Sequence, residues 1–497
     1  MSLQWIIKKG VPLFITLAVG SLIRCESDAQ KGERLAKTYC GSCHAFTQPE
    51  LLDKTTWEKS ILPEMAFRMG LPSPVISKKN FNDLQDALPT IPGKPMVTEV
   101  DYQLITKYFL SLAPDSLDTP KSMEPASLKQ FEIKQISLSE NLPMVTLLKA
   151  DSNGNIFVGN RDKSLWILQD HFVVKEKYFL DSPPSCLLSR GKKIICLEMG
   201  MMDPNDLAAG KMVELSLDSR NATTIIDSLK RPAYFEKIDL NGDHLDDYVI
   251  CEFGNYTGKL EVFENLGNEK YRSHVIEPTP GARKVVLRDC NHDGKTDIIA
   301  LMTQADERIN LYINKGNFDF SPVTLLRFPA VYGSSYFEIN DFNKDGFYDI
   351  LYTNGDNNDF SFILKPYHGV RIFLNDGHQQ FQESWFYPMY GASWAMARDF
   401  DEDGDLDIAA ISFFPDFKFK ADRSFIYFEN QDNHFTPFTT PESVSGRWLV
   451  MEVADVDHDR DLDILLGALD FKPSDGGNFE QWKEKPTSIL LLKNKLR

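Results

Sequence analysis

Hydrophobic and polar residues follow two different patterns along the chain. Lys31–Tyr39 (KGERLAKTY) and Glu99–Leu112 (EVDYQLITKYFLSL) place apolar residues at the spacing of an amphipathic helix. From Gln130 onward, short apolar runs such as DYVICEFG and DILLGAL alternate with Asp-rich segments, which is typical of strands joined by tight turns. The patterning predicts a small all-α domain followed by a large all-β domain.

A nine-residue acidic segment recurs five times in the β region. The copies are DLNGDHLDD from Asp239, DCNHDGKTD from Asp289, DFNKDGFYD from Asp341, DFDEDGDLD from Asp399 and DVDHDRDLD from Asp455. An apolar run follows each copy, and the spacing leaves room for four strands in each unit. A single Asp-rich segment is usually only a turn, but five copies in one register indicate a repeated structural unit.

The repeats predict a closed seven-bladed β-propeller. Two degenerate units, which begin at Asp151 and Lys193, precede the five acidic ones. The last unit ends without an outer strand, whereas Gln130–Leu138 (QFEIKQISL) is a strand without a unit of its own. Pairing these two ends would close the ring and remove an exposed sheet edge.

Positions 1, 3, 5 and 9 of every acidic segment hold Asp or Asn. Four such side chains and a backbone carbonyl at position 7 form the oxygen coordination that Ca²⁺ prefers. Position 12 is apolar in all five copies, which excludes an EF-hand, because that motif requires Glu there. About five Ca²⁺ ions are expected, with the ligands Asp239, Asn241, Asp243, Asp247, Asp289, Asn291, Asp293, Asp297, Asp341, Asn343, Asp345, Asp349, Asp399, Asp401, Asp403, Asp407, Asp455, Asp457, Asp459 and Asp463.

These segments resemble FG-GAP/VCBS-type repeats, in which a calcium loop joins two strands of a propeller blade. The resemblance covers roughly residues 130–497 and implies a structural role for calcium. The degenerate segment from Asp151 has Gly159 at position 9, so weak or no calcium binding is expected there.

The α region carries the motif Cys40-Gly41-Ser42-Cys43-His44. A zinc ribbon would need a second Cys pair at suitable spacing, and a thioredoxin-like site would need a βαβ context, and neither is present. Covalent haem needs two thiols for the vinyl groups and an adjacent imidazole for the iron. With its flanking helices, the motif resembles a small class I-like cytochrome c domain across residues 26–115. One haem c is expected, attached to Cys40 and Cys43 and ligated by His44.

The sixth ligand of the haem iron is open at this stage. Met65, in TTWEKSILPEMAFRMG, resembles one cytochrome pattern, in which a Trp precedes an apolar turn and a Met. Met96 lies shortly before the last helix, where many small cytochromes place a Met. Met69 or an open sixth position are further alternatives. We favour Met65, although any of the three could simply pack in the core.

The N-terminus predicts export. Two lysines precede the apolar run Val11–Ile23, whose length fits a signal peptide better than a membrane-spanning helix. Leu22-Ile23-Arg24-Cys25 resembles a bacterial lipoprotein box, although Arg24 departs from the small residue expected there. The expected location is therefore periplasmic or at the cell surface, with a lipid on Cys25 as the favoured membrane anchor. An uncleaved N-terminal anchor and plain secretion are the alternatives.

The expected organisation is a signal peptide (1–25), a cytochrome c-like domain (26–115), a linker (116–129) and the propeller (130–497). Net charge is −18, which argues against nucleic acid or anionic lipid surfaces as partners. Bound Ca²⁺ would offset part of this charge.

The propeller face opposite the acidic segments receives the long insertions, and long loops gathered on one face are usually functional. Aromatic and cationic residues near the starts of the inner strands could form a pocket at the channel mouth on this face. The alternative for each residue is packing between blades. The candidates are Tyr234, Arg283, Lys284, Tyr336, Trp394, Arg447 and Trp448.

Together these features favour an exported haem-c electron-transfer protein whose propeller binds a redox partner protein or a ligand. One alternative is an oxidoreductase or carbohydrate-active enzyme with its active site in the propeller channel, acting on a carbohydrate or another small molecule. A second alternative is an adhesion or scaffold protein. The sequence offers no convergent catalytic triad, so the question of an enzyme stays open.

Overall fold

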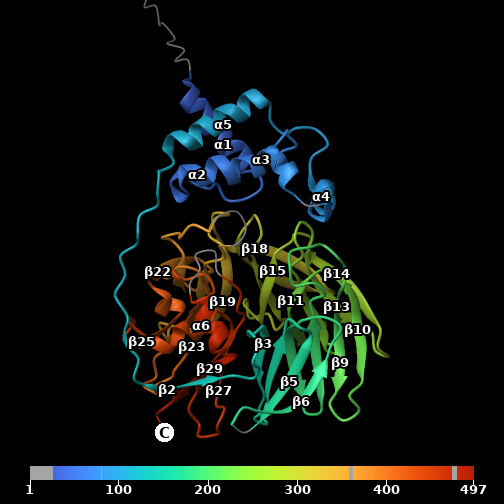
Figure 1. Ribbon diagram of the computed structural model, residues 1–497. Coiled ribbons are helices and arrows are strands. Elements are labelled where there is room, and N and C mark those ends of the chain that lie inside the picture. The colour runs from blue at the N-terminus through green and yellow to red at the C-terminus, as the bar shows by residue number, and fades with distance from the viewer. Residues whose placement is uncertain (1–25, 80, 170, 358–361, 473–477, 497) are drawn as a thin grey trace, which may run out of the picture.

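The computed structural model describes residues 26–79, 81–169, 171–357, 362–472 and 478–496. The expected signal peptide, with Cys25, lies outside the described residues. Within the described ranges, no helix is both long enough and apolar enough to cross a membrane. The chain forms a helical unit, which we define as residues 26–113, above a large ring of β-sheets (Figure 1).

The helical unit is built around two crossing helices, α1 (Asp28–Cys40) and α5 (Glu99–Leu112). Ser27 begins α1 with a capping box, and the Thr98 side chain caps α5 by accepting from the backbone N–H of Asp101. The helices approach closely at Gly32, where a Cβ would lie 2.5 Å from the Leu104 carbonyl oxygen. The shorter helices between them are α2 (Lys54–Thr56), α3 (Leu62–Arg68) and α4 (Phe81–Ala87).

The β region is a seven-bladed propeller in which every blade contains four antiparallel strands. Blades 1 to 3 comprise β3 (Val145–Ala150), β4 (Ile156–Asn160), β5 (Ser164–Gln169), β6 (Val173–Phe179); β7 (Pro184–Arg190), β8 (Lys193–Glu198), β9 (Gly210–Ser216), β10 (Ala222–Leu229); and β11 (Pro232–Ile238), β12 (Asp247–Glu252), β13 (Lys259–Asn265), β14 (Tyr271–Glu277). Blades 4 and 5 comprise β15 (Ala282–Arg288), β16 (Asp297–Met302), β17 (Arg308–Gly316), β18 (Asp319–Arg327); and β19 (Ser334–Asn340), β20 (Asp349–Asn354), β21 (Gly369–Asn375), β22 (Phe381–Pro388). Blades 6 and 7 comprise β23 (Ala392–Arg398), β24 (Asp407–Ser412), β25 (Phe425–Gln431), β26 (His434–Thr439); and β27 (Trp448–Ala454), β28 (Asp463–Ala468), β29 (Ile489–Asn494), β2 (Phe131–Ile136).

The last blade closes the ring with strands from both ends of the β region. Strand β2 pairs antiparallel with β29, from Phe131 opposite Asn494 to Ile136 opposite Ile489. This confirms the predicted seven-bladed propeller and its closure by the strand after residue 130. Strand β2 thus supplies the outer strand of the last blade and closes the ring.

Second strands of the blades form the core. Every residue of β12, β16, β20, β24 and β28 is buried, because each strand lies between two others and between neighbouring blades. This burial on both faces explains why these strands appear in the sequence as continuous apolar runs. By contrast, outer strands such as β14 and β18 consist mostly of exposed and partly buried residues.

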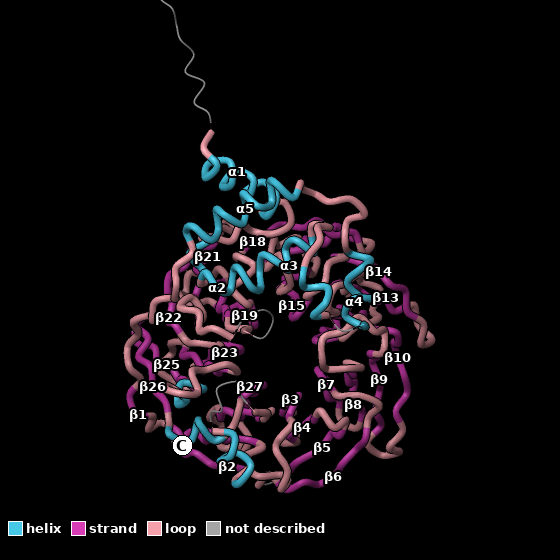
Figure 2. The backbone as a smooth tube through the Cα atoms, turned by 45° about the horizontal axis from the view of Figure 1, so that its top comes forward, coloured by secondary structure: helices cyan, strands magenta, loops and turns pink. Residues whose placement is uncertain are grey.

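The two faces of the propeller carry different loops. The five loops that join first and second strands define the acidic face: 239–247, 289–297, 341–349, 399–407 and 455–463. Loops that join second and third strands emerge on the opposite face, which we call the docking face, because the helical unit lies on it (Figures 1 and 2). An insertion of this face contains α6 (Phe479–Glu484), whose Trp482 is buried.

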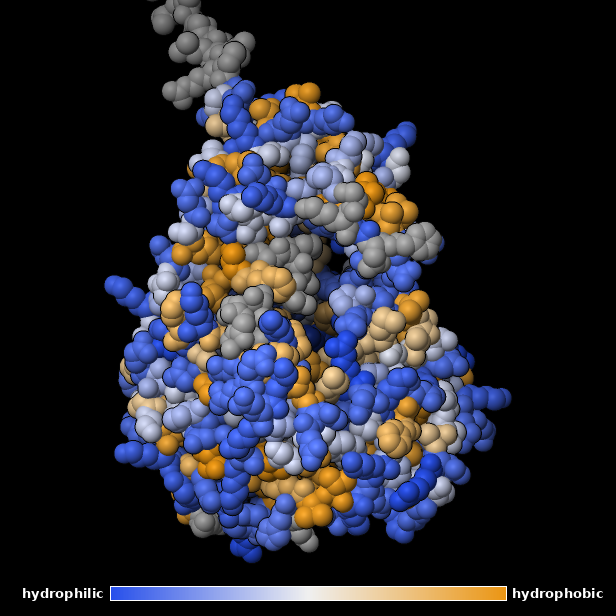
Figure 3. Space-filling view, viewed as in Figure 1, coloured by the Kyte–Doolittle hydropathy of each residue, from blue (hydrophilic) through white to orange (hydrophobic). Residues whose placement is uncertain are grey.

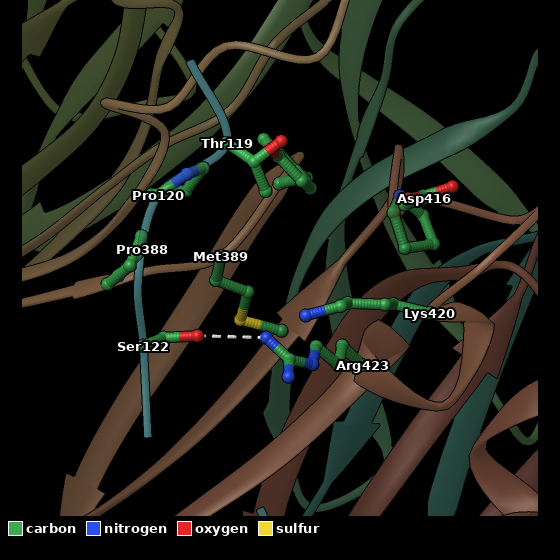
Figure 4. Close-up of a pocket in the computed structure, with 10 residues that line it drawn as sticks. Thr119, Pro120, Ser122, Pro388, Met389, Asp416, Lys420 and Arg423 are labelled. Carbon is green, nitrogen blue, oxygen red and sulfur yellow. Dashed lines mark hydrogen bonds between the residues drawn. The ribbon is translucent and has the colours of Figure 1, made fainter. Parts of the chain in front are cut away.

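The segment between the helical unit and the propeller runs down the outside of blade 6 (Figure 1). Its β1 (Ala126–Ser127) adds to β26 as a parallel fifth strand. Arg423 donates to Ser122 Oγ over 2.9 Å (Figure 4). Arg423 also forms an ion pair with Glu124. Residues 116–129, predicted as a linker, are therefore attached to the propeller along part of their length.

Candidate functional site: acidic loops and a docked helical unit

The five acidic loops share one backbone conformation. Positions 4 and 6 are left-handed in each; in the fourth loop, for example, Glu402 has φ 58° and Gly404 has φ 96°. The first Asp accepts the backbone N–H of position 6, at 3.0 Å for Asp399 with Gly404 and 3.1 Å for Asp455 with Arg460.

Carboxylates converge most closely in the fourth and fifth loops. One oxygen each of Asp399, Asp401 and Asp403 lies within 4.8 Å of the others, and the same holds for Asp455, Asp457 and Asp463. Such convergence of carboxylate oxygens fits a hard divalent cation. In the first three loops position 3 is Asn, so its neutral amide oxygen would complete the set.

The ninth Asp of each loop is fully buried and crosslinks the blade. Asp407 accepts the backbone N–H groups of Phe400 (3.2 Å) and Asn430 (2.8 Å) and the Tyr427 hydroxyl (2.7 Å). Burial raises the pKa of Asp407 to about 7 and that of Asp463 to about 6. A bound cation would favour the ionised form of these carboxylates.

An Asn at the end of the third strand was missed by sequence reasoning, although it recurs once in each acidic repeat. Its backbone N–H donates to the ninth Asp over 2.8–2.9 Å in all five repeats. Its side-chain amide donates to the carbonyl that precedes that Asp in the chain, as Asn430 does to Leu406 over 3.1 Å. The five residues are Asn265, Asn314, Asn375, Asn430 and Asn494.

The motif expected to hold haem lies at the C-terminal end of α1. Cys40 is half-buried at the edge of the helical core, Cys43 is exposed and His44 is half-buried. His44 Nδ1 lies 2.9 Å from the Ala45 carbonyl oxygen, which can only accept, so Nδ1 carries the proton and Nε2 is the free ring nitrogen. This tautomer fits iron ligation through Nε2. Burial raises the pKa of the Cys40 thiol to about 11, unlike the lowered pKa of a reactive thiol pair.

The three candidate methionines occupy different environments. Met65 lies half-buried on α3, and Met69, one turn later, is 6% exposed and packs in the helical core. Met96 is 39% exposed, and its backbone N–H donates to the Met69 carbonyl oxygen over 3.0 Å.

Tyr256, in the loop between β12 and β13, connects the propeller to the helical unit. The Arg68 guanidinium lies 4.5 Å from the centre of its ring, and Lys79 Nζ donates to its hydroxyl over 3.0 Å. Glu64, which is 3% exposed, pairs with Arg68 at 3.0 Å and Lys79 at 3.3 Å. The two cations are therefore held by a buried carboxylate and directed at one aromatic ring.

Further contacts extend this interface to blades 4 and 5. The Tyr367 hydroxyl donates to the Leu51 carbonyl over 3.0 Å, and Ala45, next to His44, forms a parallel β-bridge with Pro329. Val331 packs against the helical core. Figure 3 shows a hollow between the helical unit and the propeller beside this interface.

Four of the expected pocket residues form one cluster on the first strands. Lys284 Nζ donates to the Tyr336 hydroxyl and lies 3.7 Å from the centre of the same ring, while Trp394 stacks on Tyr336 at 4.4 Å. The ring of Tyr234 lies 5.9 Å from Lys284 Nζ. Burial lowers the pKa of Lys284 to about 8, and the nearby carboxylates of Glu338 and Glu236 oppose this shift.

The other expected pocket residues pack inside the protein. Trp448 is fully buried and donates to the Ser443 carbonyl over 2.7 Å. Arg447 is 2% exposed, and its guanidinium lies 3.8 Å from the ring centre of Phe471 and 4.2 Å from that of Phe413. Arg283 donates to the Ser335 carbonyl of the next blade. These three side chains fit the alternative of packing between blades.

Comparison with known families supports the repeat assignment. The model of the FG-GAP-like repeat matches residues 239–300 and 289–352. The chain contains FG-GAP-like repeats. The match includes the first three acidic loops and their buried second strands.

Several solved structures align with most of the chain at low identity. The N-terminal domain of Nup159 is 11% identical and covers 76% of this chain and 99% of its own, with a TM-score of 0.43. BBS1N, solved in complex with ARL6DN, is 7% identical and covers 74% and 100%, with a TM-score of 0.45. The Myceliophteria thermophila Cps50 (Swd1) β-propeller domain is 11% identical and covers 72% and 97%, with a TM-score of 0.43. No curated protein matches the sequence.

Proposed function

We propose that this protein is an exported haem-c electron-transfer protein whose calcium-stabilised propeller binds a partner protein or ligand. FG-GAP-like repeats in a propeller suggest a protein-binding or scaffold role, and the proposal adds redox chemistry to that role. The observation that carries it is the Cys40–His44 motif, which ends α1 in a helical unit docked on the propeller. A haem bound there would supply a one-electron redox centre.

The chain's own residues would hold this group in defined ways. Cys40 and Cys43 would form the two thioethers to the haem. His44 would ligate the iron through Nε2, while its Nδ1–H donates a hydrogen bond to the Ala45 carbonyl. The Ala45–Pro329 bridge ties the residue after His44 to the propeller, so the motif would keep a fixed position relative to any partner on the docking face. Met65 is the proposed sixth ligand, with Met69 and Met96 as alternatives.

Co-expression of the protein with haem-attachment enzymes tests the redox part of the proposal. We expect one covalent haem, lost when Cys40 and Cys43 are both changed to Ala. Met65→Leu should lower the midpoint potential, because a thioether ligand raises it, whereas Met123→Leu in the exposed linker should not. A chain without covalent haem would refute the proposal, and an effect of Met96→Leu or Met69→Leu alone would reassign the ligand.

Calcium is proposed as the structural cation of the acidic face. Without a cation, each loop holds three or four carboxylates together, and their mutual repulsion should loosen it. A chelator should therefore lower the melting temperature markedly, and excess Ca²⁺ but not Na⁺ should restore it. An unchanged melting temperature would rule out a structural role.

Export and lipid anchoring are proposed from residues 1–25, which lie outside the described residues. Cys25→Ala should move the protein from the membrane fraction to the soluble periplasmic fraction if a lipid is attached there. Retention in the membrane fraction would refute the lipid anchor.

A second candidate, an enzyme with its site in the channel, is favoured by the buried Lys284, whose pKa is lowered to about 8 beside the Tyr336 hydroxyl. Reduction of the haem by a sugar, alcohol or aldehyde without any partner, lost in Lys284→Met, would support the enzyme. Reduction only by another redox protein would support the electron carrier.

A further inference from the structure

The last acidic loop, 455–463, contains a cationic side chain from another strand. Lys493 lies on β29, and its ammonium forms ion pairs with Asp457 and, at 3.5 Å, with Asp459. These are positions 3 and 5 of the loop, which are expected to ligate Ca²⁺. The ammonium therefore lies beside two of the carboxylates that are expected to ligate Ca²⁺.

The register of the repeats shows that this lysine is peculiar to the last blade. Lys493 precedes Asn494, the Asn whose N–H donates to the ninth Asp. In the other acidic repeats the residue before that Asn is acidic or apolar: Glu264, Ile313, Leu374 and Glu429. Only the last loop of the five receives a basic side chain from this position.

Blade 6 gives the opposite arrangement. Its loop has Asp at positions 1, 3, 5 and 9, as the last loop has, but Glu429 replaces the lysine. One buried oxygen of Asp399 has no hydrogen-bond partner. Two loops with the same four aspartates thus differ in the charge of the residue that precedes the Asn. The blade 6 loop also pairs with Lys344, but at Asp405, outside these four aspartates (2.6 Å).

We propose that Lys493 is the built-in cation of the last loop, so that this loop needs no Ca²⁺, whereas the loop of blade 6 binds the ion. The inference rests on the proposed calcium role of the acidic face. A Ca²⁺ ion entering the last loop would have to displace the ammonium from Asp457 and Asp459 or lie against a like charge. Either event lowers affinity relative to the blade 6 loop.

This arrangement has a consequence for ring closure. Strand β29, which carries Lys493, also pairs with β2 to close the propeller. The loop on the closing blade would keep its carboxylates neutralised when calcium is scarce, so depletion should loosen blades 3 to 6 before blade 7.

Calcium stoichiometry of the full chain tests the inference. Protein stripped by a chelator is titrated with CaCl₂ by calorimetry, and bound calcium is measured by atomic emission after removal of free ions. In the natural sequence, Asp403→Ala should lower the bound calcium by one ion per chain, and Asp459→Ala should leave it unchanged. Lys493→Met should add one ion, which Asp459→Ala should remove again from that variant.

Matched variants keep the outcomes separate. Lys495→Met, two residues further along and exposed, should leave the stoichiometry unchanged, and Lys493→Gln serves if Lys493→Met fails to fold. Loss of an ion on Asp459→Ala in the natural sequence, or no gain on removal of Lys493, would overturn the inference while leaving the calcium role intact. Absence of calcium from every variant would overturn both.

Discussion

At the scale of single residues, burial changes the chemistry of several carboxyl groups far from the acidic loops. Glu307 is 2% exposed and accepts the backbone N–H groups of Gly333 (3.0 Å) and Ser334 (2.7 Å) at the start of the next blade. Burial raises its pKa to about 7, although these hydrogen bonds oppose the shift. The protonated form is therefore favoured in the folded protein more than in the unfolded chain.

Glu307→Gln should remove one pH-dependent contribution to stability. Because the pKa is raised on folding, this contribution is fully present below the unfolded pKa of about 4.3 and is lost as pH rises to about 7. The free energy of unfolding of the natural protein should fall by up to about 3 kcal/mol more than that of the variant across this window. Urea unfolding at a series of pH values measures the difference, and parallel curves would contradict the assignment.

Asn314→Ala should destabilise the propeller by about 2–3 kcal/mol. The Asn314 amide donates to Leu240 of the preceding blade (3.2 Å) and to Thr296 (3.1 Å), and its oxygen accepts the Gly316 N–H (2.8 Å). Alanine would leave these buried groups without partners. Urea unfolding of the variant, compared with exposed Lys315→Ala, provides the measurement; equal effects would show that the Asn is not a crosslink.

At the scale of elements, the closing strand and the segment before it join distant parts of the chain. Strand β2 contributes Phe131, which is 3% exposed and packs against Phe400 and Tyr427 of blade 6. Strand β1 and the Arg423–Glu124 ion pair attach the preceding segment to the same blade. The N-terminal end of the β region is thus bound to both of the last two blades.

Phe131→Ala should cost about 3–5 kcal/mol, because it leaves a cavity where the ring closes. Glu132→Ala, on the solvent side of the same strand, is the control and should change stability little. Chemical denaturation measures both, and a small effect of Phe131→Ala would show that closure depends on backbone pairing rather than on side-chain packing.

At the scale of the whole molecule, the helical unit and the propeller meet through cation–π contacts, hydrogen bonds and the packing of Val331 against the helical core. The Tyr256 ring lies under the Arg68 guanidinium, and its hydroxyl accepts a hydrogen bond from Lys79. The Tyr367 hydroxyl donates a hydrogen bond to the Leu51 carbonyl. These contacts, together with the attached linker, fix the Cys40–His44 motif relative to the docking face.

Tyr256→Ala should free the helical unit to move without unfolding either domain. Small-angle X-ray scattering should show a larger radius of gyration, while the melting temperature of the propeller stays unchanged. Tyr256→Phe retains the ring that faces Arg68 and should behave like the natural protein. An unchanged scattering profile for Tyr256→Ala would mean that the remaining contacts suffice to fix the domains.

The sequence by itself determined the propeller, because strand periodicity, turn chemistry and the acidic repeat are local and recur in register. It also determined the strand that closes the ring, since the last unit lacked an outer strand and Gln130–Leu138 was a strand without a unit of its own. It could not show that Asp407 crosslinks its blade with Asn430, that Lys493 enters the last acidic loop, or that Trp448 is buried. Those features depend on residues far apart in the chain that meet only when the blades and domains pack, so tertiary structure alone decided them.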